Sequence, residues 1–399
     1  MMLARRTALL GLGAAVSLGG SSLAVAAAPT ARRFVVVILR GALDGLAAVV
    51  PYGDRDLAAW RPELVPPPPG QPDGLLDLGG FYGMHPGLRG LHGLYQQNQL
   101  LVVHAVAGAY RTRSHFEAQD YMESGADHYM TSGRMTSGWL NRVSGALPAN
   151  PGPAGNALAV EVSLPLILRG PAPAGSWAPQ GFGAPSPDLY ARILALHGHD
   201  NVTGPAIRQG LGERGFSAGA LAGDDAPRGP RRNAFPALAA AAGKLLASAD
   251  GPRIAVLEIG GWDTHADQHN RLQAPLTELD TGLIALRQGL ADAWGQTVVL
   301  VMTEFGRTVR VNGTKGTDHG TGTVAFVLGG TVAGGRVRAD WPGLGADRLF
   351  ENRDLAPTAD LRGIAKGLLG PHLGLGTAAL DRVFPDSRGI AVAPGLLRA

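Results

Sequence analysis

The chain has 399 residues, of which 45% are hydrophobic and 17% charged, so it is long enough to bury a substantial core. Its formal net charge is +3, and no basic patch with interleaved aromatic residues is present, which argues against a nucleic-acid partner. The absence of cysteine excludes disulfide bonds, thiolate metal ligands and a cysteine nucleophile.

Residues 1–28 are predicted to be a signal peptide rather than part of the fold. Arg5-Arg6 precedes a weakly apolar stretch and an A-x-A cleavage site that begins at Ala24. The paired arginines favour the twin-arginine route, which exports folded proteins, and an ordinary secretory signal is the alternative. In either case we expect a periplasmic or secreted protein. After this segment, no run of about 20 apolar residues predicts a transmembrane helix.

Short apolar runs rich in β-branched residues predict the strands of a sheet. The runs are nearly continuous rather than alternating, as expected for strands covered on both faces. In chain order they are Phe34–Leu39, Leu100–Val106, Leu158–Val162, Ile254–Ile259, Thr297–Met302 and Thr323–Leu328. A proline- and glycine-rich loop, Pro66–Gly74, separates the first two runs.

Helical patterns lie between these runs. The clearest is Ala274–Trp294, where leucines recur at spacings of three and four and Pro275 fits the first turn. Together with the strands on either side, this helix predicts a βαβ unit, which requires parallel strands and a right-handed crossover. Further helices are expected after Ser114 and at Thr358–Leu369.

These elements predict a doubly wound α/β fold, with a largely parallel sheet and helices on both faces. We expect residues 29–399 to form a single domain of this kind. Residues 146–232 are rich in Gly, Pro and Ala and have only short periodic pieces such as Asp188–Leu196. We interpret this region as an excursion that covers or shapes the site.

Polar residues collect where the predicted strands end. Those that follow the first, second, fourth and fifth strands are Asp44, then Arg113 and Ser114, then Asp263 and His265, then Glu304 and Arg307. In open parallel sheets this carboxyl edge is where ligands bind. Asp318-His319 instead precedes the last strand, and we expect the loop before it to return this pair to the same edge.

Carboxylates and imidazoles together favour Zn²⁺, Mn²⁺ or a similar ion, whereas an all-oxygen set would suit Mg²⁺ or Ca²⁺. The candidate ligands, enough for one or two ions, are Asp44, Asp263, His265, Glu304, Asp318 and His319. Two ions suit displacement at phosphorus, because they stabilise both the attacking and the leaving oxygen. Ser114, at a helix start, is a candidate nucleophile, and Arg40, Arg113 and Arg307 are candidates to grip an anion.

Each of these residues also has a structural interpretation. Asp44 can be a turn residue or a helix cap, and Ser114 can be only an N-cap. Glu304 can pair with a neighbouring arginine, and His265 and His319 can be structural histidines.

Several motifs resemble those of the DUF1501 family, whose members commonly carry a twin-arginine leader. They occur in order along nearly the whole mature chain: Arg40-Gly-Ala-Leu-Asp-Gly, Ser114-His-Phe-Glu-Ala-Gln, Gly138-Trp-Leu-Asn-Arg, Gly260-Gly-Trp-Asp-Thr-His, Thr303-Glu-Phe-Gly-Arg, Asn312-Gly-Thr and Gly316-Thr-Asp-His-Gly. That family is similar in turn to the alkaline phosphatase and sulfatase superfamily, which implies a doubly wound α/β sheet carrying a two-metal site.

The superfamily pattern implies a role for several of these positions. It places a metal aspartate at Asp44, a nucleophile near Ser114, an aspartate–histidine pair at Asp263 and His265, and a late histidine at His319. Where the superfamily usually has Asp-His, this chain has Glu304-Phe305, so one ion would lack an imidazole unless Asp318 or His115 supplies a ligand.

The resemblance implies metal-dependent hydrolysis or transfer of a phosphate or sulfate ester, with a small anionic ester as substrate. A formylglycine sulfatase is not expected, because the Cys or Ser followed by Pro and Arg is missing. Two alternatives stay open: a non-catalytic exported metal- or ligand-binding protein, and an envelope assembly protein.

Overall fold

The computed structural model describes residues 31–127, 137–152, 155–161, 163–178, 200, 203–221 and 235–398. They lie in one compact unit, Ala31–Ala399. The predicted signal peptide and the predicted helical piece Asp188–Leu196 lie outside the described residues. Among the helices in the described part of the chain, none is long and apolar enough to cross a membrane.

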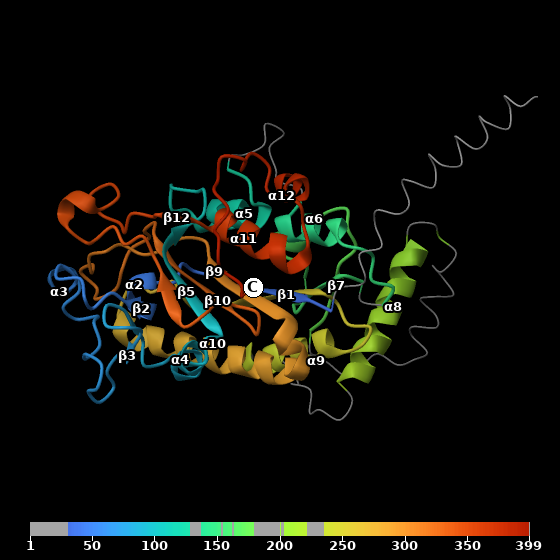
Figure 1. Ribbon diagram of the computed structural model, residues 1–399, viewed down its shortest axis with the longest axis horizontal. Helices are drawn as coiled ribbons and strands as arrows, with labels where there is room; N and C mark the ends of the chain where they lie inside the picture. Colours follow the sequence, from blue (N-terminus) through green and yellow to red (C-terminus); the bar gives the residue numbers. More distant parts are fainter. Residues whose placement is uncertain are drawn as a thin grey trace, which may run out of the picture. The chain divides into compact units, whose positions relative to one another are not determined.

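The centre of the fold is a nine-stranded sheet in the order β11-β5-β10-β9-β1-β8-β6-β7, with β12 beside β5 (Figure 1). Its strands are β1 (Arg33–Leu39), β5 (Leu100–Ala107), β6 (Ala157–Ala159), β7 (Gly175–Ser176), β8 (Ile254–Ile259), β9 (Thr297–Thr303), β10 (Thr323–Leu328), β11 (Arg336–Arg338) and β12 (Ala359–Asp360). Neighbouring strands are parallel, except that β10 is antiparallel to both β5 and β9. The sheet is therefore mixed and mostly parallel.

The antiparallel strand β10 brings its preceding loop to the carboxyl edge of the parallel strands. Its first residue, Thr323, pairs with Val106 near the end of β5. The residues before β10 therefore lie at the same edge as those that follow β1, β8 and β9, as the sequence predicted for Asp318-His319.

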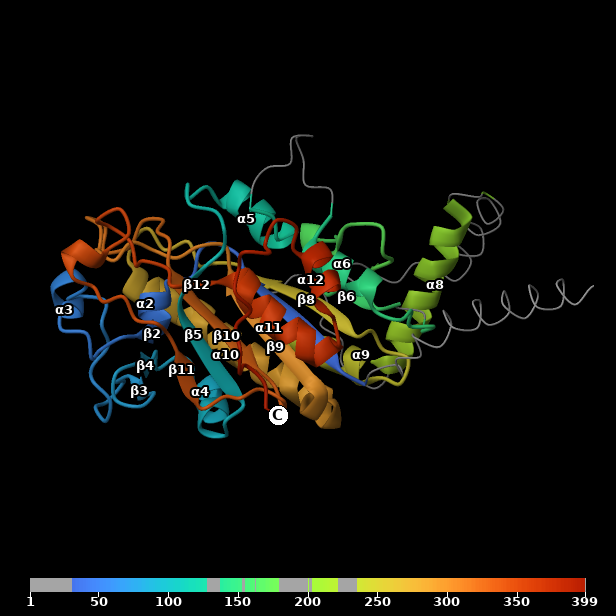
Figure 2. The same ribbon diagram turned by 45° about the horizontal axis from the view of Figure 1, so that its top comes forward.

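Both faces of the sheet are covered by helices (Figures 1 and 2). The odd-numbered residues of β1 from Val35 to Leu39 belong to one buried core, and the even-numbered residues from Phe34 to Ile38 belong to another. The first core includes α4 (Arg89–Gln96), α9 (Phe235–Ala247) and α10 (Gln268–Leu290), and the second includes α5 (His115–Ser124), α6 (Trp139–Ala146), α11 (Leu361–Leu373) and α12 (Thr377–Val383). Burial on both faces explains why the strand sequences are continuously apolar, and it confirms the doubly wound α/β fold.

Smaller elements complete the described chain. A three-stranded sheet in the order β2-β4-β3 lies between β1 and β5 in the sequence. The bounds of the smaller helices and strands are α2 (Gly45–Ala48), β2 (Val49–Val50), α3 (Leu57–Trp60), β3 (Leu76–Asp77), β4 (Gly83–Met84), η1 (Leu166–Leu168), α8 (Thr203–Ala220), η2 (Ala291–Gln296) and η3 (Ala346–Arg348). Within the Gly- and Pro-rich region 146–232, β6 and β7 join the main sheet at its edge.

The placement of Pro275 in the first turn of its helix was wrong. Helix α10 begins at Gln268, so Pro275 lies in its interior, where it removes one backbone hydrogen bond. The helix continues past it because Leu272, Leu276 and Leu279 are all buried, and this packing outweighs the proline. The expected helix near the C-terminus is α11, which starts at Leu361 after the Asp360 side chain caps it.

Candidate metal centre

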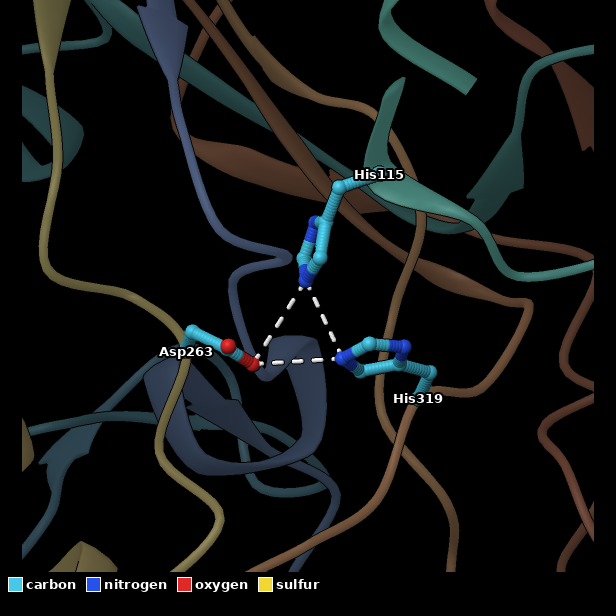
Figure 3. Close-up of side chains that lie close together, drawn as sticks. All are labelled: His115, Asp263 and His319. Atoms are coloured by element: carbon cyan, nitrogen blue, oxygen red, sulfur yellow. Dashed lines mark hydrogen bonds and ion pairs between the residues drawn. The ribbon is translucent and has the colours of Figure 1, made fainter. Parts of the chain in front are cut away.

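Two imidazoles and a carboxylate point toward one another at the carboxyl edge of the sheet (Figure 3). His115 Nε2 lies 3.0 Å from His319 Nε2 and 3.6 Å from Asp263 Oδ1, and the last two atoms are 3.3 Å apart. His265 adds a third imidazole, whose Nε2 lies 2.9 Å from His319 Nε2 and 3.0 Å from Asp263 Oδ1. The structure thus brings together three of the predicted ligands and His115.

The four residues come from three separate parts of the chain. His115 is the first residue of α5, and Asp263 and His265 lie in the loop after β8. His319 lies in the loop before β10, where it forms an isolated antiparallel bridge with Arg307. The topology of the sheet, rather than nearness in sequence, assembles the cluster.

The far nitrogen of each imidazole faces an oxygen atom. His115 Nδ1 lies 2.8 Å from Glu304 Oε1, His265 Nδ1 lies 3.3 Å from Asp318 Oδ1, and His319 Nδ1 lies 3.0 Å from the carbonyl oxygen of Arg113. Carbonyl and ionised carboxylate oxygens only accept hydrogen bonds, so each Nδ1 carries the proton. In the neutral rings, each Nε2 therefore presents its lone pair to the cluster. Metal-binding histidines are commonly held in this way.

This donor set fits a single divalent ion. His115 Nε2 and His265 Nε2 each lie 2.9–3.6 Å from His319 Nε2 and Asp263 Oδ1. Lone pairs this close repel one another unless a proton or a metal ion lies between them, even though Arg307 also donates to Asp263 Oδ1. Ligand atoms at about 2.0–2.1 Å from a tetrahedral Zn²⁺ lie about 3.3 Å apart, which agrees with these distances. Because imidazole predominates, the set suits Zn²⁺ or Mn²⁺ better than Mg²⁺ or Ca²⁺. Among the described residues, the one group whose ligand atoms all lie within 4.8 Å of one another is His115, Asp263 and His319, and His265 lies beside it.

The surroundings shift the pKa values of the two imidazoles in Figure 3 in opposite directions. The hydrogen bond to Glu304 raises the pKa of His115, against the effect of burial. Burial lowers the pKa of His319, and the neighbouring charges of His115 and Arg307 lower it further. Burial raises the pKa of Asp263, but the charges of Arg307 and the imidazoles outweigh burial, so this pKa is lowered overall. The carboxylate is therefore held in its charged form.

Glu304 and Asp318 support the histidines instead of joining the cluster. The Glu304 side chain is fully buried, and its Oε1 accepts hydrogen bonds from His115 Nδ1 and, at 2.9 Å, from the backbone N–H of Gly41. Asp318 Oδ1 accepts from His265 and, at 3.1 Å, from Asn312 Nδ2. Both carboxylates orient an imidazole through its far nitrogen.

Asp44 does not reach the cluster, in contrast to its predicted role as a ligand. It is the N-cap of α2, and its carboxylate accepts hydrogen bonds from Leu46 N at 3.1 Å, Arg61 Nη1 at 2.7 Å and Gln268 Nε2 at 2.6 Å. Its side chain is 1% exposed. The buried guanidinium of Arg61 therefore takes up the negative charge that the sequence analysis assigned to a metal.

The guanidinium groups of all three predicted anion-binding arginines interact within the protein. Arg307 is buried and donates to the carbonyl oxygens of Ala42, Thr317 and Trp262 and to the carboxylate of Asp263. It ties together the loops around the cluster. Arg113 pairs with the carboxylates of Asp354 and Glu351. Arg40, likewise, pairs with Glu123 and Glu258. Nearby carboxylates and carbonyls thus serve as partners of these guanidinium groups.

Ser114 is the N-cap residue of α5, directly before His115 in the chain, and its hydroxyl makes no capping hydrogen bond. Its role as nucleophile stays a prediction.

The sequence analysis named His115 only as a possible substitute for the imidazole that is missing at Phe305. In the structure, the Phe305 ring packs against the rings of His115 and His319, with centroids 4.9 and 5.1 Å away. Phe305 therefore lies against the cluster without offering it a ligand atom.

Residues 110–384 match the family described as "Protein of unknown function (DUF1501)". Because this match spans more than half of the sequence, the chain belongs to the DUF1501 family. Among curated protein sequences, none matches the chain.

Solved structures of low sequence identity resemble the fold. The zinc complex of the C-terminal periplasmic domain of EcEptC from Escherichia coli has 10% identity, a TM-score of 0.35, and coverage of 75% of this chain and 72% of its own. The alkaline phosphatase of the Antarctic bacterium TAB5 has 13% identity, a TM-score of 0.35, and coverage of 74% and 91%. The phosphonate monoester hydrolase of Agrobacterium radiobacter has 11% identity, a TM-score of 0.35, and coverage of 77% and 70%. The likeness concerns the fold, and no residue role is transferred from these proteins.

Proposed function

We propose that the protein is an exported, metal-dependent hydrolase or transferase that acts on phosphate or sulfate esters. The observation that supports a metal is the convergence of the Nε2 atoms of His115 and His319 on Asp263 Oδ1, with His265 Nε2 beside them and every Nδ1 proton directed away. A bound divalent ion would supply positive charge that stabilises developing negative charge on an ester and lowers the pKa of a nearby hydroxyl.

In this proposal each part of the site has one task. His115, His265, His319 and Asp263 hold the ion, while Glu304 and Asp318 fix the orientation of two of the imidazoles. The Ser114 hydroxyl, adjacent to His115, is the proposed nucleophile. Its oxygen would form a bond to phosphorus or sulfur while the bond to the ester oxygen breaks. The serine proton would pass to water, the leaving oxygen would take up a proton from water and depart as an alcohol, and a water or a second alcohol would then cleave the serine ester and free the serine.

The test combines metal analysis with a panel of activated phosphate and sulfate esters. We expect about one Zn²⁺ or Mn²⁺ per chain in the purified wild-type protein. Ser114→Ala is expected to keep this metal and lose turnover, because a hydroxyl adds little affinity beside imidazoles and a carboxylate. Asp263→Asn and His319→Ala are expected to lose metal and turnover together. Near-normal turnover by Ser114→Ala would exclude this serine, and a wild-type protein that binds no divalent ion would refute the proposal.

A non-catalytic metal-binding protein is the second candidate, and two observations favour it. The guanidinium groups of Arg113 and Arg307 are engaged within the protein, so neither is directed at an anion. In addition, the guanidinium of Arg40, the third candidate, pairs with Glu123 and Glu258. Stoichiometric metal without cleavage of any ester in the panel would identify this second function.

Export is proposed from the sequence alone. Because Arg5-Arg6 precedes a weakly apolar segment, replacing both arginines with lysine is expected to leave an unprocessed, folded form in the cytoplasm. Fractionation with an antibody against the mature chain measures this. Normal processing and export of the double variant would instead assign the general secretory route.

A further inference from the structure

A buried network of hydrogen bonds lies beside the candidate metal centre and contains none of its ligands. At its centre is Gln268, the first residue of α10, whose side chain is almost completely buried. Its Nε2 donates to Asp44 Oδ2 at 2.6 Å. Its Oε1 accepts from Thr264 Oγ1 at 2.9 Å and from Thr317 Oγ1 at 2.6 Å. One side chain therefore connects the loops after β1, after β8 and before β10.

The chemistry of the neighbours requires an amide at this position. Asp44 faces Arg61 and is an acceptor, so it must meet the amide nitrogen. The two threonine hydroxyls then donate to the amide oxygen, which has two lone pairs. A carboxylate in place of Gln268 would face that of Asp44, and an aliphatic side chain would leave buried polar atoms without partners.

The two threonines connect this network to the ligands. Thr264 lies between Asp263 and His265, and Thr317 lies two residues before His319. Both threonines are fully buried, and the backbone N–H of Thr317 donates to the carbonyl of Thr264 at 3.2 Å. A shift of either hydroxyl therefore moves the backbone that carries the ligands.

The opposite end of the network is anchored by Arg61. Its Nε donates to Val309 O at 2.8 Å and its Nη2 to Thr308 O at 2.6 Å. The N–H of Thr308 donates in turn to the carbonyl of Asp318 at 2.9 Å, next to His319. Arg61 therefore connects the network to the loop that carries His319 by a second route.

We propose that Gln268 is a positioning residue of the metal centre, and that it sets the separation of the loop that carries Asp263 and His265 from the loop that carries His319. This inference rests on the metal centre of the proposed function. Asp44 acts on the centre through Gln268, so the carboxylate that the sequence predicted as a metal ligand serves here as an anchor. Partners that orient metal ligands typically contribute about 10- to 100-fold to metal affinity.

The test uses the full chain and Co²⁺, whose visible absorption reports the number and arrangement of its ligands. Gln268→Met keeps the side-chain length and removes both hydrogen-bonding functions. We expect about 10- to 100-fold weaker Co²⁺ binding and an altered cobalt spectrum. The matched control is Asn141→Leu, which removes another buried amide, bonded to Leu168 O and Ala172 O at 2.8 Å in the second core. This control is expected to lower stability without changing cobalt affinity or spectrum.

A second pair of variants serves if Gln268→Met fails to fold. Thr317→Val removes one hydroxyl of the network, and Thr317→Ser keeps it. We expect weaker binding and a changed spectrum in the valine variant and recovery of both in the serine variant. Wild-type affinity and spectrum in Gln268→Met, or in Thr317→Val, would overturn the positioning role. If the wild-type chain binds no Co²⁺, the proposed metal centre itself has failed, and this outcome is distinct.

Discussion

The ion pair between Asp44 and Arg61 is buried, with both side chains 1% exposed and 2.7 Å between Oδ2 and Nη1. Removing one partner of such a pair leaves an uncompensated charge, at a cost of about 3–5 kcal/mol. We therefore expect Asp44→Asn to lower the free energy of unfolding of the metal-free protein by about this amount, measured by urea denaturation in chelator.

A carboxylate that served only as a metal ligand would behave in the opposite way, because its removal would relieve repulsion in the metal-free cluster. An unchanged or higher stability of Asp44→Asn without metal would therefore contradict the structural assignment. The control is Asp292→Asn, at an exposed position in η2, for which we expect almost no change.

How far the sequence predicts a site residue depends on where the partners of that residue lie. Asp263, His265 and His319 were predicted because each belongs to a loop at a strand end, and strand ends are visible in the apolar pattern. The role of Asp44 depends on its hydrogen-bond partners Arg61 and Gln268, which are far apart in the chain. No local pattern indicates that a distant guanidinium or amide will occupy a carboxylate.

At the scale of elements, α9 and α10 approach so closely that glycine is needed where they touch. A Cβ on Gly289 would lie 2.4 Å from the carbonyl oxygen of Ala240, and a Cβ on Gly243 would lie 2.6 Å from that of Leu286. Both contacts are with backbone, which cannot rotate away. We expect Gly289→Ala to lower the melting temperature, since the helices must separate or distort.

A glycine in α4 provides the matched control for this substitution. A Cβ on Gly93 would meet nothing within 4 Å. Alanine is favoured over glycine within a helix by about 1 kcal/mol, so Gly93→Ala is expected to raise stability slightly. Equal effects of the two substitutions would show that helix propensity, rather than close packing, governs Gly289.

The elements themselves were largely predictable, because burial on both faces produces the continuous apolar runs of the strands. The start of α10 was not predictable from the sequence. Pro275 is a local signal for a helix start, whereas the burial of Leu272 is not a local property of the sequence. The direction of β10 was also not evident from its own residues. It depends on pairing with β5 and β9, which lie elsewhere in the sequence.

Across the whole molecule, neutral buried histidines make stability dependent on pH. Burial lowers the pKa of His372 to about 4, and the side chain donates through Nε2 to Arg33 O at 2.8 Å. The unfolded chain has the ordinary pKa near 6.5 and binds the proton first as the pH falls. The contribution of the neutral ring is therefore complete above about pH 6.5 and is lost progressively toward pH 4.

We expect the stability advantage of wild type over His372→Gln to shrink by about 2 kcal/mol between pH 7 and pH 5. Glutamine keeps a donor toward Arg33 O but does not titrate. Using the difference between the two proteins removes the contribution of the cluster histidines, which titrate in both. Parallel unfolding curves with a constant difference over this range would contradict the assignment. His104 is fully buried, with its pKa also lowered to about 4 by burial, and serves as a second position for the same comparison.

The ligands of the candidate centre are widely separated in the chain, since His115 and His319 are 204 positions apart. His319 must therefore have been synthesised, and β10 must have paired within the sheet, before the donor atoms can meet. A chain that ends before His319 therefore lacks the complete donor set. If the proposed centre binds an ion, the ion would enter the folded protein, and its identity would depend on which ions are available where folding is completed.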